Sequence, residues 1–83
     1  MLDEYRTQIN AVDREIVALV NRRLQLVRDL KAFKDANGIT FVDPERERQL
    51  LEDRERENDG PLSDGGLRAF YTELLALTKR ELG

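Results

Sequence analysis

Apolar residues in the first part of the chain recur at alternating steps of three and four positions. The series is Leu2, Tyr5, Ile9, Val12, Ile16, Leu19, Leu26, Leu30 and Phe33. This spacing keeps side chains on one face of an α-helix, and no Pro or Gly interrupts it before Asn37-Gly38. An Asn-Gly pair suits the left-handed conformation in which many helices end. The pattern predicts one long helix over residues 3–36.

A second helix is predicted by its start signal. Asp43-Pro44 is typical of an N-cap residue followed by Pro at the first helical position, and Glu45 and Glu47 stand where the helix dipole favours negative charge. The stretch 44–58 has few apolar residues, so we expect its outer face to be solvated.

A third helix follows a dense turn signal at residues 58–61. Ser63 can cap a helix over residues 63–82, in which apolar residues again recur at helical spacing. The expected fold is all-α, a single domain over residues 1–83 with one long, one short and one medium helix.

The long helix is too long for a compact monomer. Thirty-four helical residues span roughly 50 Å, whereas a compact 83-residue domain has a radius of gyration of about 12 Å. The apolar face of the protruding part would remain exposed to solvent, which favours pairing with a second copy of the chain. We expect an entwined helical homodimer, and periodicity alone would also fit a non-catalytic helical dimerisation module.

Three basic residues lie on the inward face of the long helix. Arg23 interrupts the apolar series, and Arg6 and Lys34 lie on the same broad stripe. A buried cation without a partner is costly, so each requires an internal carboxylate or a bound anion. One reading is an internal pair of Arg23 with an acidic residue such as Glu47; the other is a bound dicarboxylate.

The spacing of these cations bears on how they could share a ligand. Arg23 and Lys34 are eleven residues apart, about 17 Å along the helix axis, so their long side chains can converge. Arg6 and Arg23 are seventeen residues apart, about 26 Å, which is too far for one metabolite. If both bind it, Arg6 comes from the partner chain, and antiparallel pairing gives two equivalent sites.

Composition excludes several classes of function. The net charge of -3 provides no general attraction for nucleic acid or anionic lipid. Cys and His are both absent, which removes disulfides, thiolate chemistry and the usual zinc sites. The longest apolar run, residues 16–20, is far below the roughly 20 residues of a membrane helix, and residues 1–5 do not resemble a signal peptide. We expect a cytoplasmic protein without metal or cofactor.

Residues 5–34 and 43–51 together resemble the all-helical chorismate mutases. The matching features, in order, are Arg6, Ile9, Asp13, Ile16, Arg22-Arg23, Lys34, Asp43, Arg46 and Glu47. The resemblance implies three helices per chain in an entwined dimer. It also implies the Claisen rearrangement of chorismate to prephenate, on the route to phenylalanine and tyrosine, a reaction that needs no cofactor.

The resemblance also implies residue roles on the long helix. Arg23 and the Arg6 of the partner chain would each bind a substrate carboxylate. Lys34 would contact a carboxylate and the ether oxygen of the breaking bond, where negative charge grows.

On the second helix, the resemblance implies that Glu47 accepts a hydrogen bond from the ring hydroxyl. Asp43 would assist at the start of that helix, in addition to capping it. Arg46 would support this end of the site.

The third helix departs from the family pattern. The resemblance implies a small hydroxyl residue that contacts the substrate, followed four positions later by a Gln or Glu that binds the ether oxygen. The preferred alignment gives Thr78 and then Leu82, with Glu81 one residue away. Glu81 could replace the missing group only if it were protonated, which would make activity rise at acidic pH.

These features leave several readings open beside an ordinary chorismate mutase. They are a weak mutase activated by a shikimate-pathway partner enzyme, a mutase for 4-amino-4-deoxychorismate, an isochorismate pyruvate-lyase on the same fold, and a non-catalytic dimer.

Overall fold

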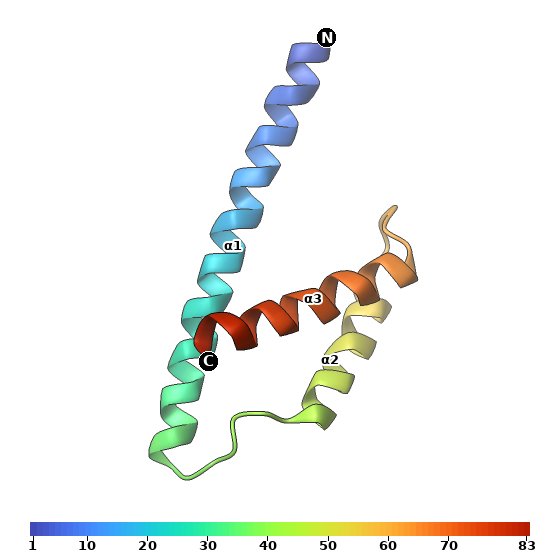
Figure 1. Ribbon diagram of the computed structural model, residues 1–83. Helices are drawn as coiled ribbons and strands as arrows, with labels where there is room; N and C mark the ends of the chain where they lie inside the picture. Colours follow the sequence, from blue (N-terminus) through green and yellow to red (C-terminus); the bar gives the residue numbers. More distant parts are fainter.

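The computed structural model describes all 83 residues and contains three α-helices and no strands. Helix α1 spans Leu2–Ala36, α2 spans Pro44–Glu57 and α3 spans Asp64–Leu82. Helix α3 crosses the C-terminal half of α1 and packs along α2, so that it contacts both other helices (Figure 1). The prediction of an all-α fold with one long, one short and one medium helix is confirmed.

Helix α1 dominates the shape of the molecule. Its 35 residues span about 52 Å at 1.5 Å per residue, and the longest dimension of the chain is 55 Å. The radius of gyration is 15.8 Å, compared with about 12 Å for a compact domain of this size. The N-terminal half of α1 extends beyond α2 and α3 (Figure 1), and no residue of α1 is buried. None of the three helices combines the length and the apolar character needed to span a membrane.

A left-handed glycine ends α1. Gly38 has a φ of +66°, and the backbone N–H of Ile39 donates to the carbonyl of Lys34 at 2.8 Å. The N–H of Gly38 donates to the carbonyl of Asp35 at 3.4 Å, which completes the double hydrogen bond of a Schellman motif. The Asn-Gly signal therefore marks the end of α1, with Gly38 as the left-handed residue. The turn directs residues 39–43 back toward the start of α2.

Helix α2 is stabilised by its cap and its surface charges rather than by a core. The Asp43 carboxylate accepts a hydrogen bond from the backbone N–H of Arg46 at 3.1 Å, which confirms the predicted N-cap. On the exposed side, Arg48 pairs with Glu45, and this hydrogen bond lowers the pKa of the Glu45 carboxyl. The small stabilisation from this pair is present above the ordinary pKa of glutamate and is lost as the pH falls through the lowered value.

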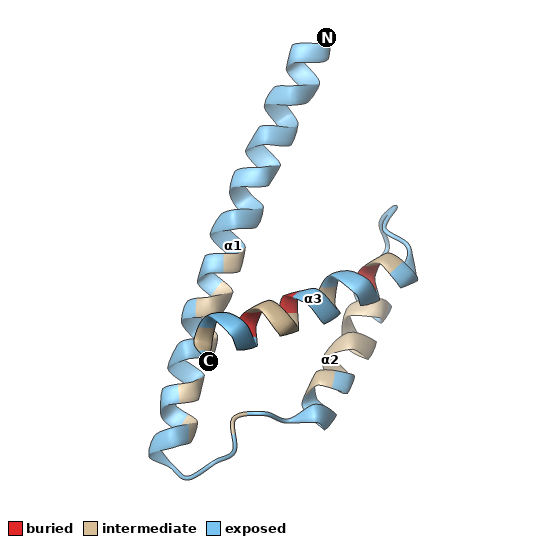
Figure 2. Ribbon diagram, in the orientation of Figure 1, coloured by how far each residue is buried: buried red, intermediate tan, exposed pale blue.

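The buried residues all belong to α3. They are Leu67, Leu74 and Thr78, whose spacing places them on one face of the helix. Figure 2 shows buried positions on α3 alone. Ser63 caps this helix by accepting a hydrogen bond from the N–H of Gly66 at 3.0 Å, as predicted. A core of three buried residues is small, and α3 is the helix that joins α1 to α2, because it packs against both while they do not pack against each other.

Candidate active site

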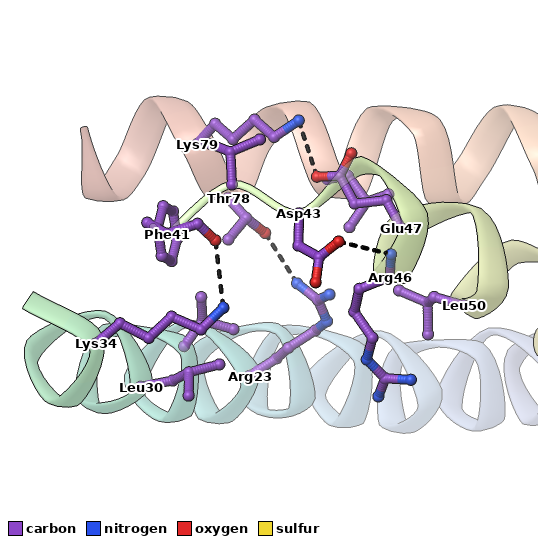
Figure 3. Close-up of a pocket in the computed structure, with 13 residues that line it drawn as sticks. Arg23, Leu30, Lys34, Phe41, Asp43, Arg46, Glu47, Leu50, Thr78 and Lys79 are labelled. Atoms are coloured by element: carbon purple, nitrogen blue, oxygen red, sulfur yellow. Dashed lines mark hydrogen bonds and ion pairs between the residues drawn. The ribbon is translucent and has the colours of Figure 1, made fainter. Parts of the chain in front are cut away.

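A cavity of about 250 Å³ lies where the three helices and the segment before α2 meet (Figure 3). Its polar lining residues are Arg23, Lys34, Asp43, Arg46, Glu47, Thr78 and Lys79. Its apolar lining residues are Val27, Leu30, Phe41, Val42, Leu50 and Leu75. Four basic and two acidic side chains leave the lining with an excess of two positive charges, which favours an anionic occupant.

Helix α1 forms one wall of the cavity through residues on a single face. Arg23, Val27, Leu30 and Lys34 follow one another at steps of four, three and four, and all four line the cavity. Lys34 is half-buried, and its Nζ donates to the carbonyl of Phe41 at 3.4 Å. The convergence of Arg23 and Lys34 across about three helical turns is therefore present in the single chain.

Thr78 holds the Arg23 guanidinium in place from α3. The Nη1 of Arg23 donates to Thr78 Oγ1 at 2.9 Å (Figure 3), and Oγ1 donates in turn to the carbonyl of Leu74 at 2.7 Å. Thr78 is only 5 % exposed, and its hydroxyl proton is already used in this second bond. The hydroxyl therefore positions Arg23 and has no proton left to donate to a ligand.

Glu47 pairs with a residue that the sequence did not single out. Its Oε1 lies 2.9 Å from the Nζ of Lys79 on α3, and both residues line the cavity. The internal pair of Arg23 with Glu47, one reading of the sequence, is not formed. Helical spacing could have revealed Lys79, because Leu75, Thr78 and Lys79 lie at i, i+3 and i+4 and share a face.

Asp43 and Arg46 are placed together by the start of α2. Both line the cavity, and the Oδ1 of Asp43 caps the helix through the N–H of Arg46. The N-cap role and a position at the site are compatible, as the sequence suggested for Asp43. Arg46 itself is exposed.

Two predicted residues lie outside the cavity of the single chain. Arg6 lies on the exposed N-terminal part of α1, and Glu81 is exposed near the end of α3. Leu82 is half-buried, and its carbonyl accepts a hydrogen bond from Lys31 Nζ at 3.2 Å. One chain thus gathers six of the eight predicted site residues and lacks Arg6 and Glu81.

The fold and the cavity define a class of protein: a three-helix domain with a cavity of net positive charge between its helices. Residues 5–81 match the family model described as chorismate mutase type II, and the chain belongs to this family.

Individual relatives agree with this assignment. The chain is 32% identical over 80 residues to the T-protein of Haemophilus influenzae, a match covering 90% of this chain and 21% of the relative. It is 35% identical over 51 residues to a chorismate mutase of Methanocaldococcus jannaschii, which covers 61% of this chain and 52% of the relative. The chain thus spans about a fifth of the first relative and about half of the second.

A solved structure shows the same fold over nearly the whole length. The chorismate mutase (form I) from Thermus thermophilus superposes with a TM-score of 0.90 at 28% identity. The match covers 93% of this chain and 96% of that one. The resemblance inferred from residues 5–34 and 43–51 is thereby confirmed as family membership.

Proposed function

We propose that this domain catalyses the rearrangement of chorismate to prephenate. The observation that carries the proposal is the convergence of Arg23 and Lys34 from one face of α1 onto a single cavity with an excess of positive charge. A cavity of about 250 Å³ suits a small metabolite, since pockets for larger, drug-sized ligands start at about 300 Å³. Chorismate carries two carboxylates, which matches the excess of two charges.

Binding of the substrate rests on a preorganised guanidinium. Arg23 is half-buried and fixed by Thr78, so its remaining N–H groups can form the planar fork that suits a carboxylate. Holding a carboxylate in this way favours the folded, chair-like conformer in which the reacting carbons approach each other. Entropy lost in binding is then no longer part of the chemical barrier.

Lys34 supplies the electrostatic part of catalysis. The rearrangement breaks a carbon–oxygen bond and forms a carbon–carbon bond within one molecule, so it requires no nucleophile. Negative charge grows on the ether oxygen during this step, and an ammonium fixed beside it stabilises the transition state more than the substrate. The side chain of Lys34 makes one hydrogen bond, a weak 3.4 Å contact with the Phe41 carbonyl. The substrate can readily replace this carbonyl as the partner of the ammonium group.

The ring hydroxyl of the substrate would face α2. Glu47 offers a carboxylate oxygen as acceptor at the cavity wall, and Asp43 and Arg46 line the same end. The Glu47 side chain is 30% exposed, so it remains accessible from the cavity while it pairs with Lys79.

The proposal includes a homodimer that shares its sites. Nine apolar residues on the inward stripe of α1 are between 45% and 63% exposed in the single chain: Leu2, Tyr5, Ile9, Val12, Ile16, Leu19, Leu26, Leu30 and Phe33. A second copy of α1 in antiparallel orientation would cover this stripe. It would also bring the partner's Arg6 toward Arg23, where it could bind the second carboxylate. Activation by another shikimate-pathway enzyme stays a prediction.

The test is to follow chorismate consumption by the purified domain and to identify the product. We expect prephenate, and we expect Lys34→Ala to lower kcat by about 10²- to 10³-fold, the usual effect of removing one transition-state donor. Arg28→Ala is the matched control, because Arg28 is an exposed cation on the same helix that does not line the cavity.

Two outcomes would refute the proposal. One is no turnover of chorismate, with or without shikimate-pathway enzymes. The other is an equal effect of the Lys34 and Arg28 substitutions. Release of pyruvate from isochorismate, without prephenate formation from chorismate, would instead identify a lyase.

A further inference from the structure

The ion pair of Glu47 with Lys79 bears on which ring substituent the site accepts. We propose that Lys79 is a specificity-determining residue that makes Glu47 select a hydroxyl group over an ammonium group on the substrate ring. The inference rests on the proposed function, because it concerns which of two related diacids the same site rearranges. Chorismate carries a hydroxyl at this ring position, and 4-amino-4-deoxychorismate carries an amine that is protonated near neutral pH.

The geometry places Lys79 within the wall of the cavity. Its Nζ lies 2.9 Å from Glu47 Oε1, and the two side chains approach from α3 and α2 (Figure 3). The Lys79 and Glu47 side chains are 45% and 30% exposed, so solvent screens the pair only in part. One carboxylate oxygen is thereby occupied, and the other remains available to a ligand.

Lys79 is the cation that pairs with Glu47 in this chain. Arg23 donates to Thr78 and Lys34 to the Phe41 carbonyl, so these two cations have other partners. Glu47 forms no other ion pair. Its negative charge is therefore balanced by Lys79 before any substrate arrives.

The two ring substituents respond differently to this balance. A hydroxyl needs one acceptor and no net charge, and the free oxygen of Glu47 provides that acceptor. An ammonium group bound to the other oxygen of this carboxylate would lie within about 8 Å of Lys79 Nζ, because two hydrogen bonds of about 2.9 Å and the width of one carboxylate separate the two nitrogens. Like charges at this distance repel, so Lys79 disfavours the amino substrate. Neutralising Glu47 also removes its repulsion of the substrate carboxylates.

The experiment compares kcat/KM for chorismate and for 4-amino-4-deoxychorismate. We expect Lys79→Met and Lys79→Gln each to raise the ratio of the amino to the hydroxy substrate by about tenfold or more. Lys79→Arg keeps the charge and should leave the ratio within about twofold of the unsubstituted domain. Arg80→Met is the matched control, since it removes one positive charge from the same helix outside the cavity.

A second measurement links the effect to Glu47. In a Glu47→Gln background, Lys79→Met should change the ratio much less, because the carboxylate that holds the ammonium group close to Lys79 is absent. A merely structural role of Lys79 would give the same change in both backgrounds.

Failure of this inference is distinguishable from failure of the proposed function. Turnover of chorismate with an unchanged ratio in both Lys79→Met and Lys79→Gln overturns the role of Lys79 alone. An equal rise in Arg80→Met also overturns it, by assigning the effect to net charge. No turnover of either substrate by the unsubstituted domain overturns the proposed function and this inference with it.

Discussion

Thr78 illustrates how a single side chain acquires its role from its neighbours. From the family resemblance, its hydroxyl is expected to contact substrate directly. In the structure this hydroxyl donates to the Leu74 carbonyl and accepts from Arg23, and the residue is buried. Its contribution is therefore to hold the guanidinium at the angle from which it can bind a carboxylate.

Replacing Thr78 should act through Arg23. We expect Thr78→Val, which preserves shape, to lower kcat/KM by roughly ten- to a hundredfold, because a hydrogen bond to a charged group contributes about 1.5–3 kcal/mol. The loss should appear mainly in KM, since Arg23 binds the carboxylate in both substrate and transition state. Steady-state kinetics on chorismate measure this division.

Thr78→Ser provides the control for packing. Serine keeps the hydroxyl and loses only the methyl group, so most of the affinity should return. If Thr78→Ser is as impaired as Thr78→Val, the methyl group and not the hydrogen bond is what matters.

At the scale of elements, the turn after α1 connects helix geometry to the site. The left-handed Gly38 reverses the chain, so that the Phe41 carbonyl reaches Lys34 and Asp43 reaches the cavity wall. The N-caps of α2 and α3 then fix where these helices begin. The Gly38 turn and the two N-caps are thus local signals that position the Phe41 carbonyl, Asp43 and the starts of α2 and α3 around the site.

Replacement by alanine should affect stability differently at Gly38 and at Gly65. Both have open space where a Cβ would lie, but only Gly38 has a positive φ. We expect Gly38→Ala to lower the free energy of unfolding by about 1–2 kcal/mol, the cost of a left-handed alanine. Gly65→Ala, inside α3, should leave it unchanged or raise it by up to about 1 kcal/mol.

Urea denaturation at one fixed protein concentration measures both effects, because subunit association would make stability depend on concentration. Equal changes in the two variants would contradict the conformational explanation.

For the whole molecule, the decisive feature is the exposed apolar stripe of α1. The chain buries only three residues, and its longest helix spans about 52 Å. Much of its apolar surface is therefore exposed to solvent. Pairing through α1 would both cover this surface and complete the site with Arg6 of the partner chain. Folding, association and activity should therefore depend on one another.

Subunit mixing tests the shared site. Arg6→Ala and Lys34→Ala should each be nearly inactive alone, yet a mixed dimer has one site in which both residues are intact. Random exchange of equal amounts should restore about a quarter of the unsubstituted activity, since half the dimers are mixed and each has one good site.

A mixture of Arg6→Ala with the Arg6→Ala/Lys34→Ala double variant is the negative control. No recovery in the first mixture, once subunit exchange has been demonstrated, would argue that each chain acts alone.

Much of the architecture could be predicted because its causes are local. Helical spacing, the Asp43 and Ser63 caps and the Asn37-Gly38 end signal act within a few residues of the chain, and each is present in the structure. The common face of Arg23 and Lys34 follows from the helix repeat alone. The sequence by itself therefore determined the three helices and the cation-bearing wall of the cavity.

The opposite wall was decided only by the tertiary structure. The pairing of Lys79 with Glu47 and the use of Thr78 by Arg23 join residues from different helices. Such contacts depend on the angle at which α3 crosses α1 and α2, which the packing of a few buried side chains sets. No local pattern encodes that angle, so the partners of the site residues become visible only when the helices are packed together.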